Sequence, residues 1–108
     1  GCGINRIDWK ARVAEIGIFI GDKNYWGKGY GTDATKVLIR ICFAQMNMNK
    51  VSLHVFSFND RAQKCYEKCG FSVEGVLRQE IYANGGYHDD IAMGILRSEW
   101  DDNEDGNR

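Results

Sequence analysis

The spacing of apolar and polar positions along the chain predicts its elements, because strands and helices repeat with different periods. Residues 1–8 are typical of the end of a strand, residues 8–11 of a turn, and residues 12–20 of a second strand. These two strands form a predicted hairpin. Residues 12–20 are apolar enough for both of their faces to be covered. Apolar side chains then recur at helical spacing over residues 34–48.

The second half of the chain predicts a further strand, a short helix and a final hairpin. Residues 50–58 are β-branched and aromatic and indicate another buried strand. Two strands joined through a helix predict a right-handed βαβ unit. Asn59 or the residue after it is expected to cap a short helix. Residues 71–83, with a bulge at a glycine, and residues 87–96 then form a hairpin that turns at Asn-Gly-Gly. The expected fold is an α/β (α+β) domain with a mixed sheet and two helices.

A glycine-rich stretch separates the strand at 12–20 from the helix at 34–48. Gly27, Gly29 and Gly31 alternate within it. Glycine lets a ligand approach the main chain, and unpaired N–H groups ahead of a helix N-terminus form an anion site. The stretch therefore predicts a phosphate cradle, with a flexible loop ahead of the helix as the alternative.

Two known phosphate loops fit this stretch poorly. A Walker A loop requires Ser or Thr after its lysine, whereas Lys28 is followed by Gly29. The Rossmann spacing is met by Gly29, Gly31 and Ala34. However, eight residues separate Ile20 from Gly29, which is too long for the tight first turn of that motif. A Rossmann-type nucleotide site remains a weaker alternative.

Composition indicates one globular domain over residues 1–97 and an acidic tail over residues 98–108. The tail holds five acids and one arginine, a net charge of −4, which leaves +3 for residues 1–97. This slight basic balance does not favour nucleic acid as a partner. No apolar run approaches the roughly 20 residues that cross a membrane. The sequence therefore predicts neither a nucleic-acid partner nor a membrane partner.

The four cysteines form neither a C-x-x-C pair nor a cluster with histidine, so no metal site is expected. Cys65 and Cys69 lie four positions apart on the expected second helix and should share its buried face. Free thiols and the lack of a recognisable signal peptide indicate a cytoplasmic protein.

Two motifs resemble those of the GNAT acetyltransferases. The stretch Trp26-Gly27-Lys28-Gly29-Tyr30-Gly31 is similar to the pyrophosphate loop of that family, [QR]-x-x-G-x-[GA], with Trp26 at the Gln/Arg position. The pattern N-x-x-A-x-x-x-Y-x-x-x-G-F follows, carried by Asn59, Ala62, Tyr66, Gly70 and Phe71. The resemblance covers nearly the whole chain and is greatest to the ribosomal-protein N-terminal and spermidine/diamine acetyltransferase branch. It implies a mostly antiparallel sheet with a V-shaped cleft between two parallel strands, here without the usual N-terminal strands and helices.

What the resemblance implies is transfer of an acetyl group from acetyl-CoA to a primary amine, such as a protein N-terminus or a polyamine, by direct attack. The pyrophosphate would lie on the amides of residues 27–32, and the pantetheine arm would pair like a strand with residues 17–20. A main-chain N–H there would polarise the thioester carbonyl. The implied cofactor-binding residues are Gly17, Ile18, Phe19, Ile20, Trp26, Gly27, Lys28, Gly29, Tyr30, Gly31, Thr32, Asn59 and Tyr66.

Tyr66 is the candidate general acid for the leaving thiolate, because a phenol stays protonated near neutral pH. The alternative is an ordinary core aromatic on the helix face. Glu15 is the candidate general base, because a carboxylate within an apolar strand is costly unless it is paired, solvated or used. The alternative for Glu15 is a surface ion pair with Arg6 or Arg12. His54 is interpreted as structural.

His88 and Asp89 resemble a family position near the last strand, where they either contact the acceptor or stabilise the hairpin; the second interpretation is preferred. Asn59 is expected to contact pantetheine, to cap its own helix, or to do both.

Three functions remain open at this point. The first is an N-acetyltransferase, or the catalytic half of one. The second is an acetyl-CoA-binding fragment without turnover, because the elements that form one wall of the acceptor site in the family are missing. The third is a nucleotide-binding fragment that uses the glycine-rich stretch. The chain is expected to be N-terminally truncated, and its exposed first strand is expected to pair with another copy in a homo-oligomer.

Overall fold

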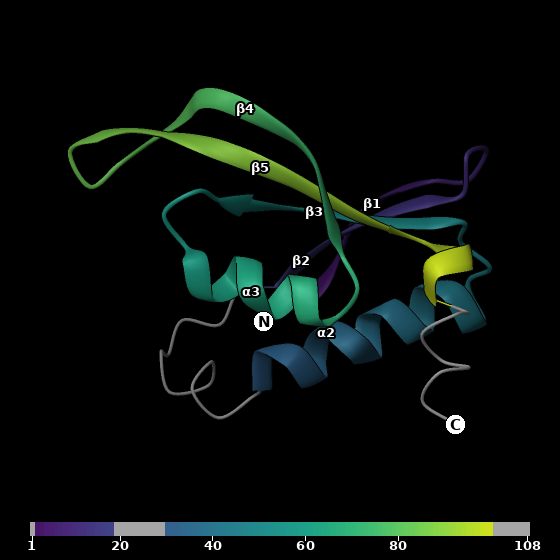
Figure 1. Cartoon of the computed structure of the whole chain (residues 1–108). Coiled ribbons are helices and arrows are strands. Elements are labelled where there is room, and N and C mark those ends of the chain that lie inside the picture. The colour runs from purple at the N-terminus through teal and green to yellow at the C-terminus, as the bar shows by residue number, and fades with distance from the viewer. Residues whose placement is uncertain (1, 19–29, 101–108) are drawn as a thin grey trace.

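A computed structural model of the chain describes residues 2–18 and 30–100 (Figure 1). Along the chain the elements are β1 (Cys2–Asp8), β2 (Val13–Ile18), α2 (Tyr30–Arg40), the π-helical turn η1 (Ile41–Gln45), β3 (Lys50–Phe56), α3 (Asp60–Lys68), β4 (Ser72–Ala83) and β5 (Gly86–Leu96).

The strands form one sheet in the order β1-β2-β3-β5-β4. Neighbouring strands are antiparallel except for β2 and β3, which are parallel and are joined through α2. The predicted mixed, mostly antiparallel sheet is therefore confirmed, as are the opening hairpin and the βαβ unit. Parallel neighbours need a crossover connection, and here that connection includes the glycine-rich stretch.

Both helices lie on the same face of the sheet, below it in Figure 1. The core forms between this face and the helices, from residues such as Ile16, Val51 and Met93 on the strands and Leu38 and Phe43 on α2 and η1. The opposite face has no helix over it in the described part of the chain. The prediction that residues 12–20 are covered on both faces is therefore wrong for the described residues 12–18, and the buried strand predicted at residues 50–58 is buried on one face only. Side chains alternate between buried and accessible along β3 instead.

The first helix differs from its predicted span of 34–48. It begins at Tyr30 and passes into η1, which ends at Gln45. The amide of Met46 donates to the carbonyl of Ile41 at 3.0 Å, which closes a wider turn than that of an α-helix. Met48 continues the apolar spacing because its side chain is fully buried, although it lies beyond the helix. The helical spacing of buried side chains therefore continues beyond the residue at which the helix ends.

The second helix, α3, has the capping that the sequence predicts. The side chain of Asn59 accepts a hydrogen bond from the amide of Ala62 at 3.1 Å, so Asn59 is the N-cap. Cys65, Tyr66 and Cys69 are buried, as their spacing indicates. Gly70, with a φ of 106°, ends the helix in a conformation that favours glycine.

The β4–β5 hairpin extends beyond the helices (Figure 1). Its turn at Asn84 and Gly85, both with positive φ, is confirmed. The predicted bulge at Gly75 is present as a shift in register between Val73 and Gly75. A second shift, between Leu77 and Ile81, was not predicted.

Arg97 joins the end of β5 to the end of the first helix. Its Nε donates to the carbonyl of Met48 at 2.9 Å, and its Nη2 donates to the carbonyl of Phe43. The guanidinium also lies over the Phe43 ring, 5.5 Å from its centroid. Residues 97–100 form a helical turn, and the Trp100 ring packs 5.3 Å from that of Phe43. Trp100 therefore packs against the core of the described chain.

We expect Arg97→Ala to lower the free energy of unfolding by about 2 kcal/mol, because it leaves the carbonyls of Phe43 and Met48 without a charged donor. Arg97→Lys should recover only part of this loss, because an ammonium cannot form the same fork. Urea denaturation followed by circular dichroism measures both. Arg78→Ala, at an exposed position on β4, is the matched control. Equal midpoints for the Arg97→Ala and Arg78→Ala variants would contradict this role.

Candidate active site

The parallel pairing of β2 with β3 covers only their first residues. Val13 pairs with Lys50, Ala14 with Val51, and Glu15 with Ser52. Strand β2 continues to Ile18 and β3 to Phe56 without further pairing to each other in the described chain. On its other side β2 remains paired to β1 through Gly17 and Ile18. Main-chain groups of residues 16–18 on the β3 side are therefore available to an extended ligand.

The N-terminus of α2 follows directly after the glycine-rich stretch. The helix begins at Tyr30 and carries Thr32 in its first turn. The Thr32 hydroxyl lies 3.2 Å from Sγ of Cys65, so α3 is held against this turn. A helix N-terminus attracts anions because its amides lack partners within the helix. The described residues therefore fit the anion site that the sequence predicts.

Several predicted cofactor-binding positions fall outside the described residues: Phe19, Ile20, Trp26, Gly27, Lys28 and Gly29. The structure likewise does not describe the side chains of Ile18 and Tyr30 or the surroundings of Gly31. The structure thus describes the two ends of the predicted cradle, β2 before it and α2 after it.

Tyr66 is 5 % exposed and lies in the core beneath the sheet. Its ring meets that of Phe71 edge-on, with 6.0 Å between centroids. Burial, together with nearby Cys65 and Cys69, raises the pKa of Tyr66 to about 12. The phenol is therefore protonated throughout the neutral range, as a proton donor must be, and it also satisfies the alternative interpretation as a core aromatic.

Two thiols lie beside Tyr66. A hydrogen bond from Cys69 lowers the pKa of Cys65 to about 6, and the Thr32 hydroxyl and the charge of Lys68 act in the same direction against the effect of burial. The same hydrogen bond and burial raise the pKa of Cys69. The two thiols thus differ in direction, with the pKa lowered at Cys65 and raised at Cys69.

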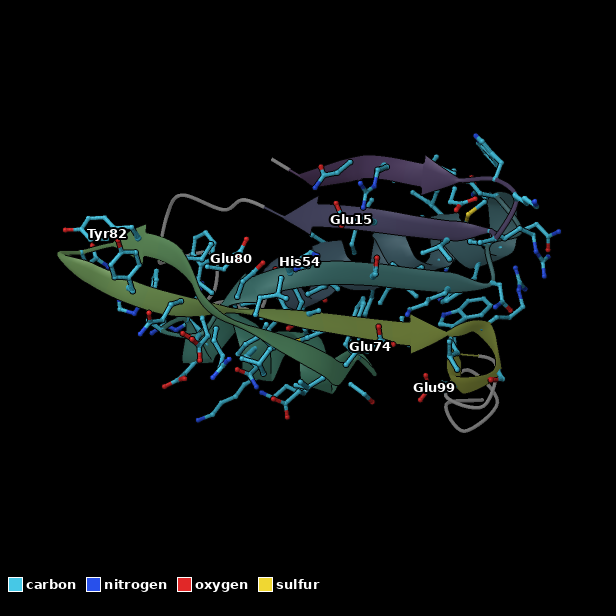
Figure 2. All side chains as sticks on the ribbon, turned by 90° about the horizontal axis from the view of Figure 1, so that it is seen from above. Glu15, His54, Glu74, Glu80, Tyr82 and Glu99 are labelled. Carbon is cyan, nitrogen blue, oxygen red and sulfur yellow. The ribbon has the colours of Figure 1, made fainter. Side chains whose placement is uncertain are left out.

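Glu15 lies on the opposite face of the sheet from Tyr66. Its neighbours Ala14 and Ile16 point into the core, so strand alternation directs Glu15 to the face without helices. Figure 2 views this face, with Glu15 on β2 and His54 on β3. Oε1 of Glu15 lies 3.8 Å from Nη2 of Arg6, which is the ion pair expected as the alternative to catalysis. The structure does not bring Glu15 and Tyr66 into contact.

Glu15 has a second, closer neighbour that the sequence analysis missed. Nε2 of His54 lies 3.5 Å from Oε1 of Glu15, and Nδ1 of His54 lies 3.1 Å from Oδ2 of Asp90 on β5. His54 was interpreted as structural on a buried strand, but its side chain is 42 % exposed. The strand alternation of residues 50–58 places His54 opposite the buried positions, and that signal was available in the sequence.

His88 and Asp89 make contacts within the last hairpin. Nε2 of His88 lies 3.0 Å from the carbonyl of Ala83, and Asp89 accepts a hydrogen bond from the amide of Gln79 at 2.9 Å. The amide of Asp89 also donates to the hydroxyl of Ser57 at 3.1 Å. These contacts agree with the structural interpretation.

No group of three or more His, Cys, Asp or Glu side chains in the described residues has an arrangement that would hold a metal ion. Among the same residues, no helix is both long enough and apolar enough to cross a membrane.

Comparison with known proteins identifies the family. Residues 1–72 match the family model of the acetyltransferase (GNAT) domain. This chain belongs to the GNAT acetyltransferase family, as the resemblance of its motifs predicts.

Relatives of this chain include two spermidine N(1)-acetyltransferases. It is 39% identical over 89 residues to that of Escherichia coli K12, which covers 82% of this chain and 47% of the relative. It is 36% identical over 94 residues to that of Vibrio cholerae, which covers 87% of this chain and 54% of the relative. The chain thus spans about half the length of these relatives.

Solved structures of related enzymes agree with this family assignment. The Vibrio cholerae spermidine N-acetyltransferase in complex with CoA and spermine superposes with a TM-score of 0.82 at 35% identity, over 90% of this chain and 57% of that one. Another structure of the Vibrio cholerae enzyme is described as dodecameric. The sheet and helix arrangement is therefore that of the GNAT fold.

The low pKa of Cys65 predicts selective alkylation. At about pH 7, iodoacetamide should modify Cys65 faster than Cys42, because the thiolate is the nucleophile and burial raises the pKa of Cys42. Thr32→Val should slow the reaction at Cys65, because it removes a hydroxyl that stabilises the thiolate. Peptide mass mapping measures both rates in one sample. Equal rates at the two cysteines of the folded chain would contradict the assignment of the thiolate.

Proposed function

We propose that this chain is the acetyl-CoA-binding half of an N-acetyltransferase that transfers an acetyl group to a primary amine. The observation that carries the proposal is the separation of β2 and β3 beyond Glu15 and Ser52, next to the N-terminus of α2, in a chain of the GNAT family. Residues 1–97 are proposed as one acetyltransferase-like domain, with residues 98–108 as an acidic C-terminal segment. The cytoplasmic location expected from the sequence stays a prediction.

The cosubstrate would be held by main-chain groups in two places. Its pyrophosphate would lie at residues 27–32, a range that ends in the first turn of α2, because helix N-termini bind anions. Its pantetheine arm would pair with residues 17–20, of which Gly17 and Ile18 belong to β2 beyond its last pair with β3. Asn59 would lie beside the same arm while its side chain caps α3. The CoA in the Vibrio cholerae structure supports this choice of cosubstrate.

The reaction needs a neutral amine and a protonated leaving group. An alkyl ammonium has a pKa of about 10, so it must lose a proton before attack on the thioester carbonyl. Glu15 is proposed to take part in that step on the helix-free face. Tyr66 is proposed to protonate the CoA sulfur as the carbon–sulfur bond breaks. A polyamine acceptor is supported by the spermidine acetyltransferase relatives, and a protein N-terminus remains the other amine that the family resemblance implies.

A second candidate is a binding module that holds acetyl-CoA without turnover. The two candidates share the cosubstrate site and differ in acetyl transfer.

Calorimetric titration of the chain with acetyl-CoA and with ADP tests the cosubstrate site. We expect acetyl-CoA to bind at least about tenfold more tightly than ADP, a difference of about 1.4 kcal/mol, because ADP lacks the arm that pairs with β2. Equal affinities would instead favour a nucleotide site. No binding to the folded chain would contradict the proposal.

Acetyl transfer to spermidine tests turnover, with chromatography of the acetylated product as the readout. Tyr66→Phe should lower kcat by about 100-fold while leaving acetyl-CoA affinity nearly unchanged, because it removes only the proton donor. Tyr82→Phe, on the exposed hairpin, is the matched control. Binding without transfer to spermidine or to N-terminal peptides would favour the module without turnover.

The homo-oligomer expected from the first strand is also proposed here. Strand β1 pairs on one side only, with β2, in the described sheet. An unpaired strand edge favours association with another strand. Light scattering at high protein concentration should give a mass above that of the 12.3 kDa chain. A single monomeric species at every concentration would contradict this proposal.

A further inference from the structure

We propose that His54 accepts a proton from the ammonium group of the acceptor and that Asp90 is the residue that positions its imidazole. This inference rests on the proposed acetyl transfer to an amine, and it names the group that makes the amine nucleophilic. It is argued from a row of three side chains on the helix-free face of the sheet.

The row crosses three adjacent strands. Glu15 lies on β2, His54 on β3 and Asp90 on β5, and the two contacts to the imidazole are 3.5 Å at Nε2 and 3.1 Å at Nδ1. Asp90 is opposite Phe56 in the register, so it reaches His54 diagonally across the β3–β5 pair. The imidazole is therefore held between two carboxylates that come from different strands.

Asp90 is suited to fix the orientation of the ring. Its side chain is 13 % exposed, and its Oδ1 is buried without a hydrogen-bond partner in the described chain. An ionised carboxylate only accepts hydrogen bonds, so contact with Oδ2 requires a proton on Nδ1 of His54. The hydrogen bond at one ring nitrogen determines which nitrogen remains free to accept.

The other nitrogen then faces an acceptor. With Nδ1 protonated, Nε2 of a neutral imidazole carries a lone pair directed at Oε1 of Glu15, which also accepts. Two acceptors at 3.5 Å repel each other unless Nε2 carries a proton of its own or an outside donor contacts both atoms. A primary ammonium supplies three N–H donors and a positive charge, so it satisfies both groups together. The site therefore favours a cationic amine and provides the base that deprotonates it.

The row also lies where β2 and β3 separate. Glu15 and Ser52 form the last pair in the register of the two strands. On the same face, His54 is the next residue of β3 and Gly17 is the next residue of β2. A Cβ at Gly17 would lie 2.5 Å from Nδ2 of Asn5, so a side chain there would displace Asn5. The acceptors are thus at the start of the gap that the proposed pantetheine arm enters.

The step balances as follows. Nε2 of His54 takes one proton from the ammonium, and the nitrogen lone pair that is released attacks the thioester carbon. The carbon–sulfur bond breaks when the tetrahedral adduct collapses, and the electron pair leaves on sulfur. Tyr66 protonates the sulfur to the CoA thiol, and the second nitrogen proton, which is lost to solvent as the amide forms, balances the proton that Tyr66 regains from solvent. His54 returns its proton to solvent, and Asp90 stabilises the imidazolium while it exists.

The charged groups around His54 are few in the described chain. Glu15 faces it from β2 and Asp90 from β5, and Arg6 of β1 lies beyond Glu15. Farther along the same face Lys50 pairs with Glu74 at 2.7 Å. If the role of His54 is purely structural, Glu15, His54 and Asp90 only hold the strands together. In that case His54→Gln, which keeps a hydrogen-bonding side chain, would largely preserve their contacts.

The ring tautomer provides a test that does not need turnover. The chain has two histidines, so their imidazole nitrogens can be assigned by ¹⁵N NMR with His88→Gln as the reference spectrum. At high pH we expect His54 to carry its proton on Nδ1 in the native chain and to lose this preference in Asp90→Asn. An equal tautomer distribution in both chains would overturn the positioning role of Asp90.

Acetyl transfer to spermidine provides the second test. His54→Gln, which keeps a hydrogen-bonding side chain but cannot hold a proton, should lower kcat/KM by about 100-fold at neutral pH and by less at high pH, where free amine is present. His88→Gln should leave the rate unchanged. Added imidazole should partly restore the rate of His54→Ala. A His54→Gln variant with native rates would overturn the role of His54.

Together, the tautomer measurement and the acetyl-transfer assay distinguish failure of the proposed function from failure of this inference. If the native chain binds acetyl-CoA but acetylates no amine, the proposed turnover is contradicted and so is the role of His54 as proton acceptor. In that case an Nδ1 preference that Asp90→Asn abolishes still supports the positioning by Asp90. If the native chain acetylates spermidine and both His54→Gln and Asp90→Asn keep full activity, this inference is overturned and the proposed function stays intact.

Discussion

The short parallel pairing between β2 and β3 is the constraint on which the rest of this structure depends. It holds for three residue pairs and ends at Glu15 and Ser52. Because parallel strands require a crossover, the same pairing requires the connection between β2 and β3 that contains α2. Strand β3 remains paired to β5 along its whole length, from Lys50 to Phe56, so β2 alone diverges from it. The end of the β2–β3 pairing and the presence of α2 between these strands thus follow from one feature of the backbone, and the proposed acetyl-CoA site uses both.

The one-sided packing of the sheet decides where chemistry can take place. The face against α2 and α3 is filled with apolar side chains, where an unpaired carboxylate would be costly. Strand alternation directs Glu15, His54 and Asp90 to the other face, where they are paired and partly solvated. Tyr66 and the thiols lie on the core side. The two sets of titratable groups are therefore separated by the sheet, and the gap between β2 and β3 lies beside Glu15.

Local sequence signals were reliable where a single residue fixes its own backbone. The cap by Asn59, the helix end at Gly70 and the turn at Asn84 follow from side-chain hydrogen bonding and from tolerance of positive φ. The expectation that the strands are buried on both faces was wrong, because apolar content does not tell on which side the helices pack. The end of the first helix was misplaced because buried Met48 continues the apolar spacing past the π-helical turn.

The sequence by itself determined the order of elements, the family and the candidate acid and base, Tyr66 and Glu15, because these depend on motifs and periodicity along the chain. The tertiary structure alone decided that Glu15 meets His54 and that His54 meets Asp90. Those contacts join β2, β3 and β5, and they depend on strand order and register. Because each of these three strands reaches its neighbour through a different connection, no spacing in the sequence encodes the distance between their side chains.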